Sequence, residues 1–210
     1  MRPADPAVTR AHIQTLGLDE PLARALAARE VAPDDGIHFL NPTLKALFPD
    51  PSTFMDMDAA ATAILDALQS GEKIHVFADY DVDGASSAAL LVRWFRHLGA
   101  ELPIYVPDRL KEGYGPSAPA FDRLKAIGAD LVITVDCGAA ANEAVAHAAS
   151  IGLKVVVIDH HMMREEPPSC LAVVNPNRPG CASGQGNLAA AGVVFVLLAA
   201  LNREGRKRNL

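Results

Sequence analysis

The chain has 210 residues, of which 50% are hydrophobic and 5% aromatic, and its formal net charge at pH 7 is −6. This length and hydrophobicity allow one substantial core and argue against a disordered protein. Scarce aromatic residues favour aliphatic α/β layers over an aromatic-rich β-sandwich. The net negative charge gives the chain as a whole no electrostatic attraction to a polyanion. A local basic strip or a bound cation can still attract one. The three cysteines form no CxxC pair, as is typical of reduced thiols in the cytoplasm.

Two features of the chain ends bear on its location and completeness. The N-terminus has no apolar signal segment, and the longest apolar run, 188–201, is shorter than the roughly 20 residues that cross a bilayer. We therefore expect a cytoplasmic protein without a membrane anchor. The run predicts a helix buried on most sides, and the nine residues after it are too few to cover such a helix. We expect a fragment of a longer protein, incomplete at its C-terminus.

The first quarter of the chain differs from the rest in its frequent prolines. Prolines interrupt residues 1–52, which predicts short pieces with one helix over 20–30. We expect this region to form a helical N-terminal extension and residues 53–210 to form the main domain, which begins with a helix predicted over 57–71.

Strands and helices then alternate. Strands are predicted at 73–78, 102–107, 131–135 and 153–158, and helices at 86–99, 117–128 and 142–152. The strands are continuous apolar runs, as expected when helices cover both faces of a sheet. The order predicts an α/β fold with a doubly wound, mainly parallel sheet.

Acidic residues follow three of these strands. They are Asp79, Asp81 and Asp83 after the first strand, Asp136 after the third, and Asp159 after the fourth, where His160 and His161 continue the chain. Because the carboxyl ends of parallel strands meet at one edge of a sheet, we expect these side chains to converge there. Taken singly, each acid is also an ordinary helix cap or turn residue.

A cluster of five carboxylates needs a compensating partner. Two unit negative charges about 4 Å apart repel by on the order of 4 kcal/mol at an effective dielectric of about 20. Carboxylates with one or two imidazoles suit Mn²⁺ or Mg²⁺ better than Zn²⁺. Two such ions, with Asp136 as the expected bridge, would stabilise both oxygens of a phosphoryl displacement.

Residues 109–117 follow the second strand and can face the same edge. Arg109 and Lys111 offer charge to a phosphate, and Gly113 and Gly115 allow its close approach to the backbone, while Tyr114 could stack on a base. An ordinary Gly-rich surface loop remains an equally good interpretation.

Two further sets of residues leave alternatives open. Ser86 and Ser87 are predicted at a helix start, where they cap the helix or help its N-terminus to hold a phosphate oxygen. Cys137 is expected to be a small packed residue below the site, and a zinc role together with Cys181 is the minor alternative.

Five motifs occur in a fixed order along the chain. They are DYDVDG at 79–84, RLKEGYGPS at 109–117, TVDCG at 134–138, DHH at 159–161 and VVNPNR at 173–178. Together they resemble the DHH phosphoesterases, and in particular the members that are exonucleases specific for single-stranded DNA. The resemblance extends upstream, since residues 39–68 are similar to the segment that precedes these motifs in that group.

The resemblance implies a hydrolase that degrades single-stranded DNA from its 5′ end to mononucleotides during recombination and repair, with two divalent ions, preferably Mn²⁺ and otherwise Mg²⁺. It implies metal ligands at Asp79, Asp81, Asp83, Asp136 and His160. It further implies that His161 contacts the scissile phosphate, that Asp159 supports the histidines, that Arg109 and residues 113–115 hold the strand, and that Asn175 lies near the crevice.

Family members of this kind continue past 210 residues to a further metal-binding aspartate, a second domain and commonly an OB-like DNA-binding domain. Partners such as a single-strand-binding protein or a helicase would bind through those parts. Two other functions stay open: a phosphodiesterase for short oligonucleotides or cyclic dinucleotides, and a non-catalytic interaction module.

Overall fold

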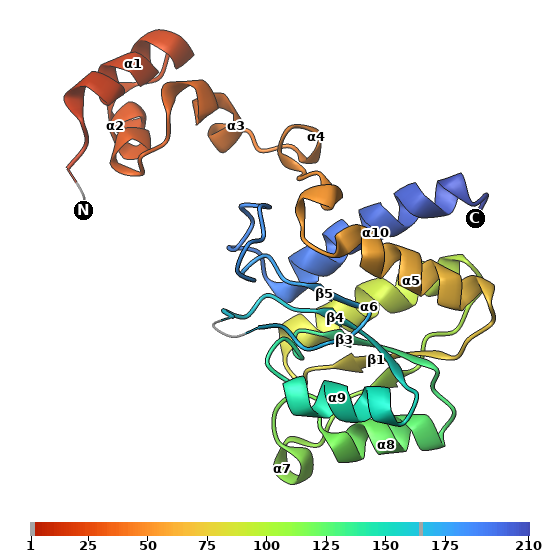
Figure 1. Cartoon of the computed structure of the whole chain (residues 1–210). Helices are drawn as coiled ribbons and strands as arrows, with labels where there is room; N and C mark the ends of the chain where they lie inside the picture. The colour runs from red at the N-terminus through yellow and green to blue at the C-terminus, as the bar shows by residue number, and fades with distance from the viewer. Residues whose placement is uncertain (1–2, 164–165) are drawn as a thin grey trace. The chain divides into compact units, whose positions relative to one another are not determined.

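The fold was analysed in a computed structural model of the chain, which describes residues 3–163 and 166–210 (Figure 1). By its internal contacts the chain divides into two units, Met1–Pro49 and Asp50–Leu210. The first unit holds α1 (Pro6–Leu16), α2 (Glu20–Ala28), a 3₁₀ turn (Pro33–Asp35), α3 (Gly36–Leu40) and α4 (Leu44–Leu47).

Helix α1 was not expected from the sequence. It starts at Pro6 behind Asp5, whose carboxylate accepts a hydrogen bond from the Ala7 amide at 2.7 Å, and it ends at Gly17 with a φ of 66°. These are ordinary helix start and stop signals. The helix predicted over 20–30 is confirmed as α2, and α1 was missed because prolines that suggested breaks stand at helix starts.

The second unit is built on a five-stranded parallel sheet in the order β2-β1-β3-β4-β5. Its strands are β1 (Ile74–Ala78), β2 (Ile104–Tyr105), β3 (Leu131–Val135), β4 (Lys154–Ile158) and β5 (Ala172–Val174). The predicted parallel α/β fold is confirmed. Strand β5 was not predicted, because three residues are too few for a pattern, and β2 is shorter than the six residues expected.

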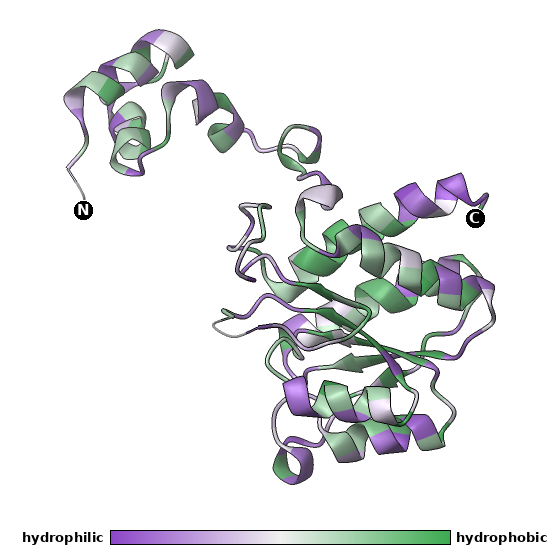
Figure 2. Cartoon of the chain, viewed as in Figure 1, coloured by the Kyte–Doolittle hydropathy of each residue, from purple (hydrophilic) through white to green (hydrophobic). Residues whose placement is uncertain are grey.

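Helices cover both faces of this sheet (Figure 1). One layer contains α5 (Met57–Gln69), preceded by a 3₁₀ turn (Pro51–Thr53), together with α6 (Val82–His97) and α10 (Ala190–Lys207), and the other contains α8 (Ala118–Ala126) and α9 (Asn142–Ser150). Every residue of β1 and β3 is buried. Figure 2 shows the strands as hydrophobic over most of their length, which matches this double cover.

Helix α10 packs against α5 and α6. Its Val193, Leu197 and Leu201 are fully buried, and the Trp94 indole donates to the Asn202 side-chain oxygen at 2.9 Å. The expectation that this helix lacks a cover was wrong, because two helices distant in sequence provide it. Among the described residues, no helix has the length and hydrophobicity that crossing a membrane requires.

The parallel pairing of the strands places Asp79, Asp136 and Asp159, which follow β1, β3 and β4, at one edge of the sheet. The Asp79 amide donates to the Val135 carbonyl, that of Asp136 to the Ile158 carbonyl, and that of Asp159 to the Val174 carbonyl. After β1 the chain turns to one side of the sheet, and after β3 it turns to the other. The ends of β1 and β3 therefore flank the point where strand order reverses, which is where such sheets bind ligands.

Candidate metal centre

Five of the predicted residues gather at this edge in two overlapping groups. Asp79, Asp81 and Asp136 form one group, and Asp136, His160 and His161 form the other. Within each group the potential ligand atoms lie within 4.8 Å of one another. Because Asp136 belongs to both groups, it is the carboxylate that two neighbouring cations could share.

Asp136 lies in an unfavourable environment for a free anion. Its side chain is buried and its φ of 61° is in the left-handed region, which few non-glycine residues adopt. Burial, followed by the negative charge of Asp83, raises the pKa of Asp136 to about 7. Burial also raises the pKa of Asp79. A cation at this position would favour the ionised form of both carboxylates.

His160 is oriented toward these carboxylates. Its Nδ1 lies 3.0 Å from the Leu188 carbonyl oxygen, which can only accept, so in a neutral ring the hydrogen belongs on Nδ1 and Nε2 is the nitrogen available to a metal. Nε2 lies 3.3 Å from Asp136 Oδ1 and 3.6 Å from Asp83 Oδ2. Metal-binding histidines commonly donate their second ring nitrogen to a carbonyl in this way. The donor set, three carboxylates and imidazole nitrogen, fits Mn²⁺ or Mg²⁺.

His161 is held by Asp159 at the end of β4. Asp159 Oδ1 accepts from the amides of His160 and His161 and lies 2.7 Å from His161 Nδ1. Its Oδ2 accepts from the Ala139 amide at 2.9 Å. These bonds lower the pKa of Asp159 despite its burial, and the bond to Asp159 raises the pKa of His161. On its other side, His161 Nε2 lies 3.3 Å from the Tyr114 hydroxyl.

Asp81 and Asp83 also serve as helix caps. Asp81 Oδ1 accepts from the Asp83 and Gly84 amides at the start of α6. The Asp83 carboxylate accepts from the Ala190 and Ala191 amides at the start of α10, at 2.7 and 2.8 Å. Capping occupies Oδ1 of Asp81 only, so Oδ2 can still face a cation. Asp83 lies beside the centre, outside both groups of ligand atoms found in the described residues.

The two serines do not lie where the sequence predicted. Helix α6 starts at Val82, so Ser86 and Ser87 are inside its first turns. The Ser86 hydroxyl donates to the Val82 carbonyl at 2.6 Å, and Ser87 is fully buried. The expected capping role was wrong because Asp81 caps the helix instead, and neither serine is at an amide-bearing helix terminus.

Residues 109–117 approach the centre through a short helix, α7 (Arg109–Glu112). The Arg109 guanidinium carbon lies 5.1 Å from the centre of the Tyr80 ring, and Lys111 pairs with Asp108 at 3.2 Å. Gly113 and Gly115 have φ values of 81° and 73°. The Lys111 side chain remains 82% exposed in this pair, whereas Arg109 stacks over Tyr80, which lies between Asp79 and Asp81 in the sequence.

Tyr114 reaches the centre through its hydroxyl, which lies 3.3 Å from the Asp136 carbonyl oxygen. Its ring meets Tyr80 and His161 edge-on, with centroids 6.4 and 6.1 Å away. Tyr80 was not predicted as a site residue. Its position between two candidate ligands in the sequence was the available signal.

Two asparagines order the chain after the histidines. Asn175 is fully buried and donates to the His161 carbonyl at 2.9 Å, and Asn177 donates to the His160 carbonyl at 2.6 Å. Asn177 was missed, although both residues belong to the NPN motif. Cys137 is buried below the site, and neither it nor Cys181 belongs to a ligand group of the described residues.

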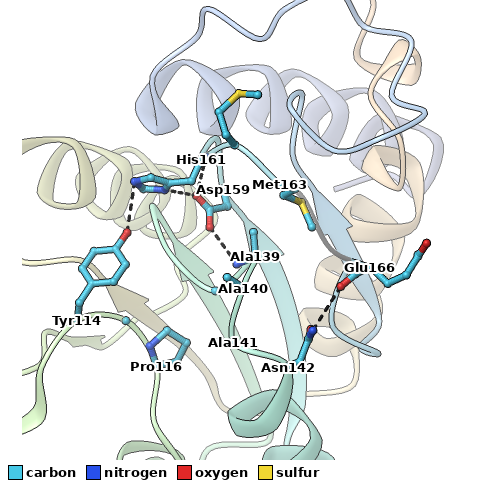
Figure 3. Close-up of a pocket in the computed structure, with 13 residues that line it drawn as sticks. Tyr114, Pro116, Ala139, Ala140, Ala141, Asn142, Asp159, His161, Met163 and Glu166 are labelled. Carbon is cyan, nitrogen blue, oxygen red and sulfur yellow. Dashed lines mark hydrogen bonds and ion pairs between the residues drawn. The ribbon is translucent and has the colours of Figure 1, made fainter.

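A cavity of about 660 Å³ opens beside His161 (Figure 3). Its walls come from the segment at Tyr114–Pro116, the turn at Gly138–Asn142, and residues that follow β4. In Figure 3 the Tyr114 hydroxyl, His161 and Asp159 form a chain of interactions along one side of it. His161 therefore belongs to a group of candidate metal ligands and also lines this cavity.

Comparison with known proteins agrees with this arrangement. Residues 73–210 match the DHH family, N-terminal domain. The chain belongs to the DHH family. It is 42% identical over 159 residues to the single-stranded-DNA-specific exonuclease RecJ of Bacillus subtilis, covering 76% of this chain and 20% of that protein. It is 39% identical over 146 residues to RecJ of Escherichia coli, covering 69% of this chain and 25% of that protein.

Solved RecJ structures share the DHH-family fold. A RecJ exonuclease bound to manganese superposes with a TM-score of 0.65 at 34% identity, over 72% of this chain and 38% of that one. RecJ from Thermus thermophilus in complex with Mn²⁺ gives a TM-score of 0.76 at 28% identity, over 97% of this chain and 28% of that one. The chain thus spans between about a fifth and two fifths of the length of these relatives.

Proposed function

We propose that this chain is the catalytic DHH part of a divalent-metal-dependent exonuclease that hydrolyses single-stranded DNA from its 5′ end to mononucleotides, in recombination and repair in the cytoplasm. The observation that carries the proposal is the membership of the buried Asp136 in both ligand groups. The similarity to RecJ proteins named as single-stranded-DNA-specific exonucleases supports the substrate. A single-strand-binding protein and a helicase are the partners we propose.

We propose that two ions, Mn²⁺ or Mg²⁺, are held at this edge of the sheet. Asp79, Asp81 and Asp136 would hold one, and Asp136 and His160 the other, with Asp83 close by. When bound, such ions would supply the positive charge that polarises a phosphate and makes a water molecule a better nucleophile. The manganese and magnesium complexes of similar RecJ structures support this choice.

The remaining roles belong to side chains around this centre. His161, oriented by Asp159, would contact the scissile phosphate through Nε2. Arg109, stacked over Tyr80, would hold a phosphate of the strand. We also propose residues 53–210 as the DHH domain and 1–52 as its helical extension, supported by the division of contacts after Pro49.

The test is the release of mononucleotides from a 5′-phosphorylated single strand in the presence of Mn²⁺, with wild-type chain and Asp136→Ala compared. Activity should fall by at least about 1,000-fold, because the variant removes the ligand common to both ion sites. Asp122→Ala is the matched control, since it removes an exposed carboxylate on α8 that pairs with His147. Unchanged turnover in Asp136→Ala would falsify the assignment.

The cavity beside His161 gives one reason to test smaller substrates in the same assay. At about 660 Å³ it is within the size range of small-ligand sites, about 300 to 1,000 Å³. Faster hydrolysis of dinucleotides or cyclic dinucleotides than of long single strands would replace the exonuclease by a phosphodiesterase for short substrates. Mn²⁺ binding without hydrolysis of any of these substrates would favour an interaction module.

A further inference from the structure

The segment 108–114, which includes α7, has little apolar anchoring of its own. It runs between two buried residues, Pro107 and Gly115, and none of its seven residues, all of which the structure describes, is buried. Leu110, within α7, is 95% exposed. A four-residue helix is unstable by itself, because its few hydrogen bonds do not offset the cost of ordering it. Polar contacts therefore hold the segment in place.

Glu112, the last residue of α7, makes several of these polar contacts. Its Oε2 accepts a hydrogen bond from the Tyr105 hydroxyl at 2.6 Å and forms an ion pair with Arg123. Its Oε1 accepts from the Asp108 amide at 3.0 Å, and Arg123 Nε donates to the Tyr105 hydroxyl at 2.9 Å. Glu112, Tyr105 and Arg123 thus bond to one another in a closed ring, which we call the Glu112 cluster.

The Glu112 cluster connects α7 to the sheet and to α8. The Tyr105 ring, at the end of β2, stacks on the ring of Phe77 in β1, with centroids 5.4 Å apart and an interplanar angle of 24°. Phe77 is fully buried and lies two residues before Asp79. Arg123 belongs to α8, which lies near α7 (Figure 1). Glu112 is therefore bonded to groups that rest on the same core as the metal centre.

The contacts of the segment with the metal centre are weaker than those of Glu112. The Tyr114 hydroxyl lies 3.3 Å from the Asp136 carbonyl oxygen and 3.3 Å from His161 Nε2, and Figure 3 shows the second contact. Hydrogen bonds of hydroxyl groups are usually about 2.7 Å long. Arg109 is exposed, and a stacking contact such as the one it makes with Tyr80 stabilises little in water. Both residues therefore depend on Glu112, which lies between them in the sequence.

Glu112 is suited to orient its neighbours and not to bind a metal or transfer a proton. Burial acts to raise its pKa, but the bonds from Tyr105 and the Asp108 amide and the charge of Arg123 lower that pKa below its usual value. Glu112 is therefore an anion at neutral pH, and both of its oxygens already accept hydrogen bonds. It belongs to neither group of candidate ligands in the described part of the chain.

We propose that Glu112 is a positioning residue that, together with Tyr105 and Arg123, holds Arg109 and Tyr114 at the metal centre, where they meet the DNA strand. This inference rests on the function proposed above and adds to it the group that fixes the strand-binding segment. Loss of the Glu112 cluster should release the segment and leave the metal ligands in place.

Trypsin cleavage of the metal-free chain tests this positioning without a measurement of activity. The bond after Arg109 lies inside the segment, and its cleavage requires the segment to open locally. Arg123→Met removes the ion pair and leaves the sequence of the segment intact. Cleavage after Arg109 should then be at least about fivefold faster than in wild type. The matched control is Arg93→Met, which changes an exposed arginine on α6 and should leave this rate unchanged.

Cleavage after Lys154, in β4, reports the opening of the sheet and should be equal in all three proteins. Equal rates after Arg109 in Arg123→Met and wild type overturn the inference. An equal acceleration after Lys154 also overturns it, because Arg123 would then act on the whole fold.

Steady-state hydrolysis of a 5′-phosphorylated single strand with Mn²⁺ tests the consequence for the substrate. Glu112→Gln keeps the side-chain shape and removes the charge. It should raise KM about tenfold and change kcat by less than about threefold, because strand binding weakens while the metal ligands stay in place. Mn²⁺ affinity should not change. Glu101→Gln, which alters an exposed carboxylate before β2, is the matched control and should leave all three constants unchanged. A fall in kcat or in Mn²⁺ affinity at unchanged KM contradicts the inference.

The two experiments separate this inference from the proposed function. If the wild-type chain binds no Mn²⁺ or releases no nucleotides, the proposed function is wrong for this chain, and the cleavage rates still decide whether the Glu112 cluster holds the segment. If the wild-type chain is active and Glu112→Gln has the same KM, the positioning role alone is wrong.

Discussion

Asp136 and Asp159 end neighbouring strands at the same level of the sheet, and each is only 2% exposed. Their environments nevertheless act in opposite directions. The pKa of Asp136 is raised to about 7 by burial and by the charge of Asp83. The pKa of Asp159 is lowered, because three amides and the His161 ring donate to it. Two equally buried carboxylates thus have opposite protonation preferences, because their neighbours differ.

The difference shows what each strand end is suited to do. Asp159 is stabilised as an anion by the protein itself, so it can orient a histidine without help. Asp136 has carboxylates and His160 Nε2 for neighbours, so its charge requires a partner from outside the chain. A buried acid without donors is expected at a cation site, and a buried acid with several donors is expected at a structural or orienting position.

Removing the charge of Asp136 should weaken metal binding more than any other single substitution at this edge of the sheet. Asp136→Asn keeps the side-chain shape and tolerates the left-handed φ, but it removes the charge that both ligand groups share. Mn²⁺ affinity should fall by more than about 100-fold, beyond the range for residues around metal ligands. The metal-free variant should be more stable than wild type at pH 8 by on the order of 2 kcal/mol, because a raised pKa reports an unfavourable buried charge.

Calorimetric titration with Mn²⁺ and urea unfolding in the presence of a chelator check these two outcomes. Asp159→Asn serves as the control, since it should destabilise the metal-free chain. An Asp136→Asn variant that is less stable than wild type would mean that Asp136 is a structural acid like Asp159.

Removing the charge of Asp159 should instead affect stability and the orientation of His161. Asp159→Asn loses the ionic acceptor of His161 Nδ1 and of three amides, so we expect about 2 kcal/mol of lost stability. Turnover should fall about 30-fold, as expected for a residue that orients another one. Mn²⁺ affinity should change much less than in Asp136→Asn.

The decisive readout is the pKa of His161 by NMR, which Asp159 raises in the wild-type chain. It should decrease in Asp159→Asn. A variant that loses activity while His161 keeps its raised pKa would show that Asp159 acts only through stability.

The smallest expected effect is on the pH dependence of stability. The folded-state pKa of Asp136, about 7, exceeds its unfolded value of about 3.9, so its favourable contribution is present at low pH and is lost as the pH rises through 7. The metal-free chain should therefore lose about 1 kcal/mol of stability between pH 6 and 8. The raised pKa of His161 acts in the same direction.

Unfolding midpoints measured across this range, with a chelator present, check this prediction. The decrease should be mostly absent in Asp136→Asn and mostly retained in Asp159→Asn, because the contribution of Asp159 in the wild type is lost only below about pH 4. With excess Mn²⁺ the trend should reverse, because metal binding favours deprotonated ligands. A flat profile for metal-free wild type contradicts the raised pKa of Asp136.

The amino-acid pattern alone was enough to predict the fold class and the position of most candidate ligands. Continuous apolar strands followed by acids place those acids at one edge of a parallel sheet, whatever the details of packing. The observed β3, Leu131–Val135, coincides with its prediction. This information is local, since the apolar run of each strand and the acid that follows it are readable over a few residues.

The differences between these residues arise from contacts that form only in the folded chain. The bonds of Asp83 to the start of α10 span more than 100 residues, and the four donors of Asp159 come from two separate turns. The cavity likewise needs three segments that meet only in the fold. The protonation of a carboxylate depends on the donors and charges within a few ångströms of it, and the sequence does not specify those distances.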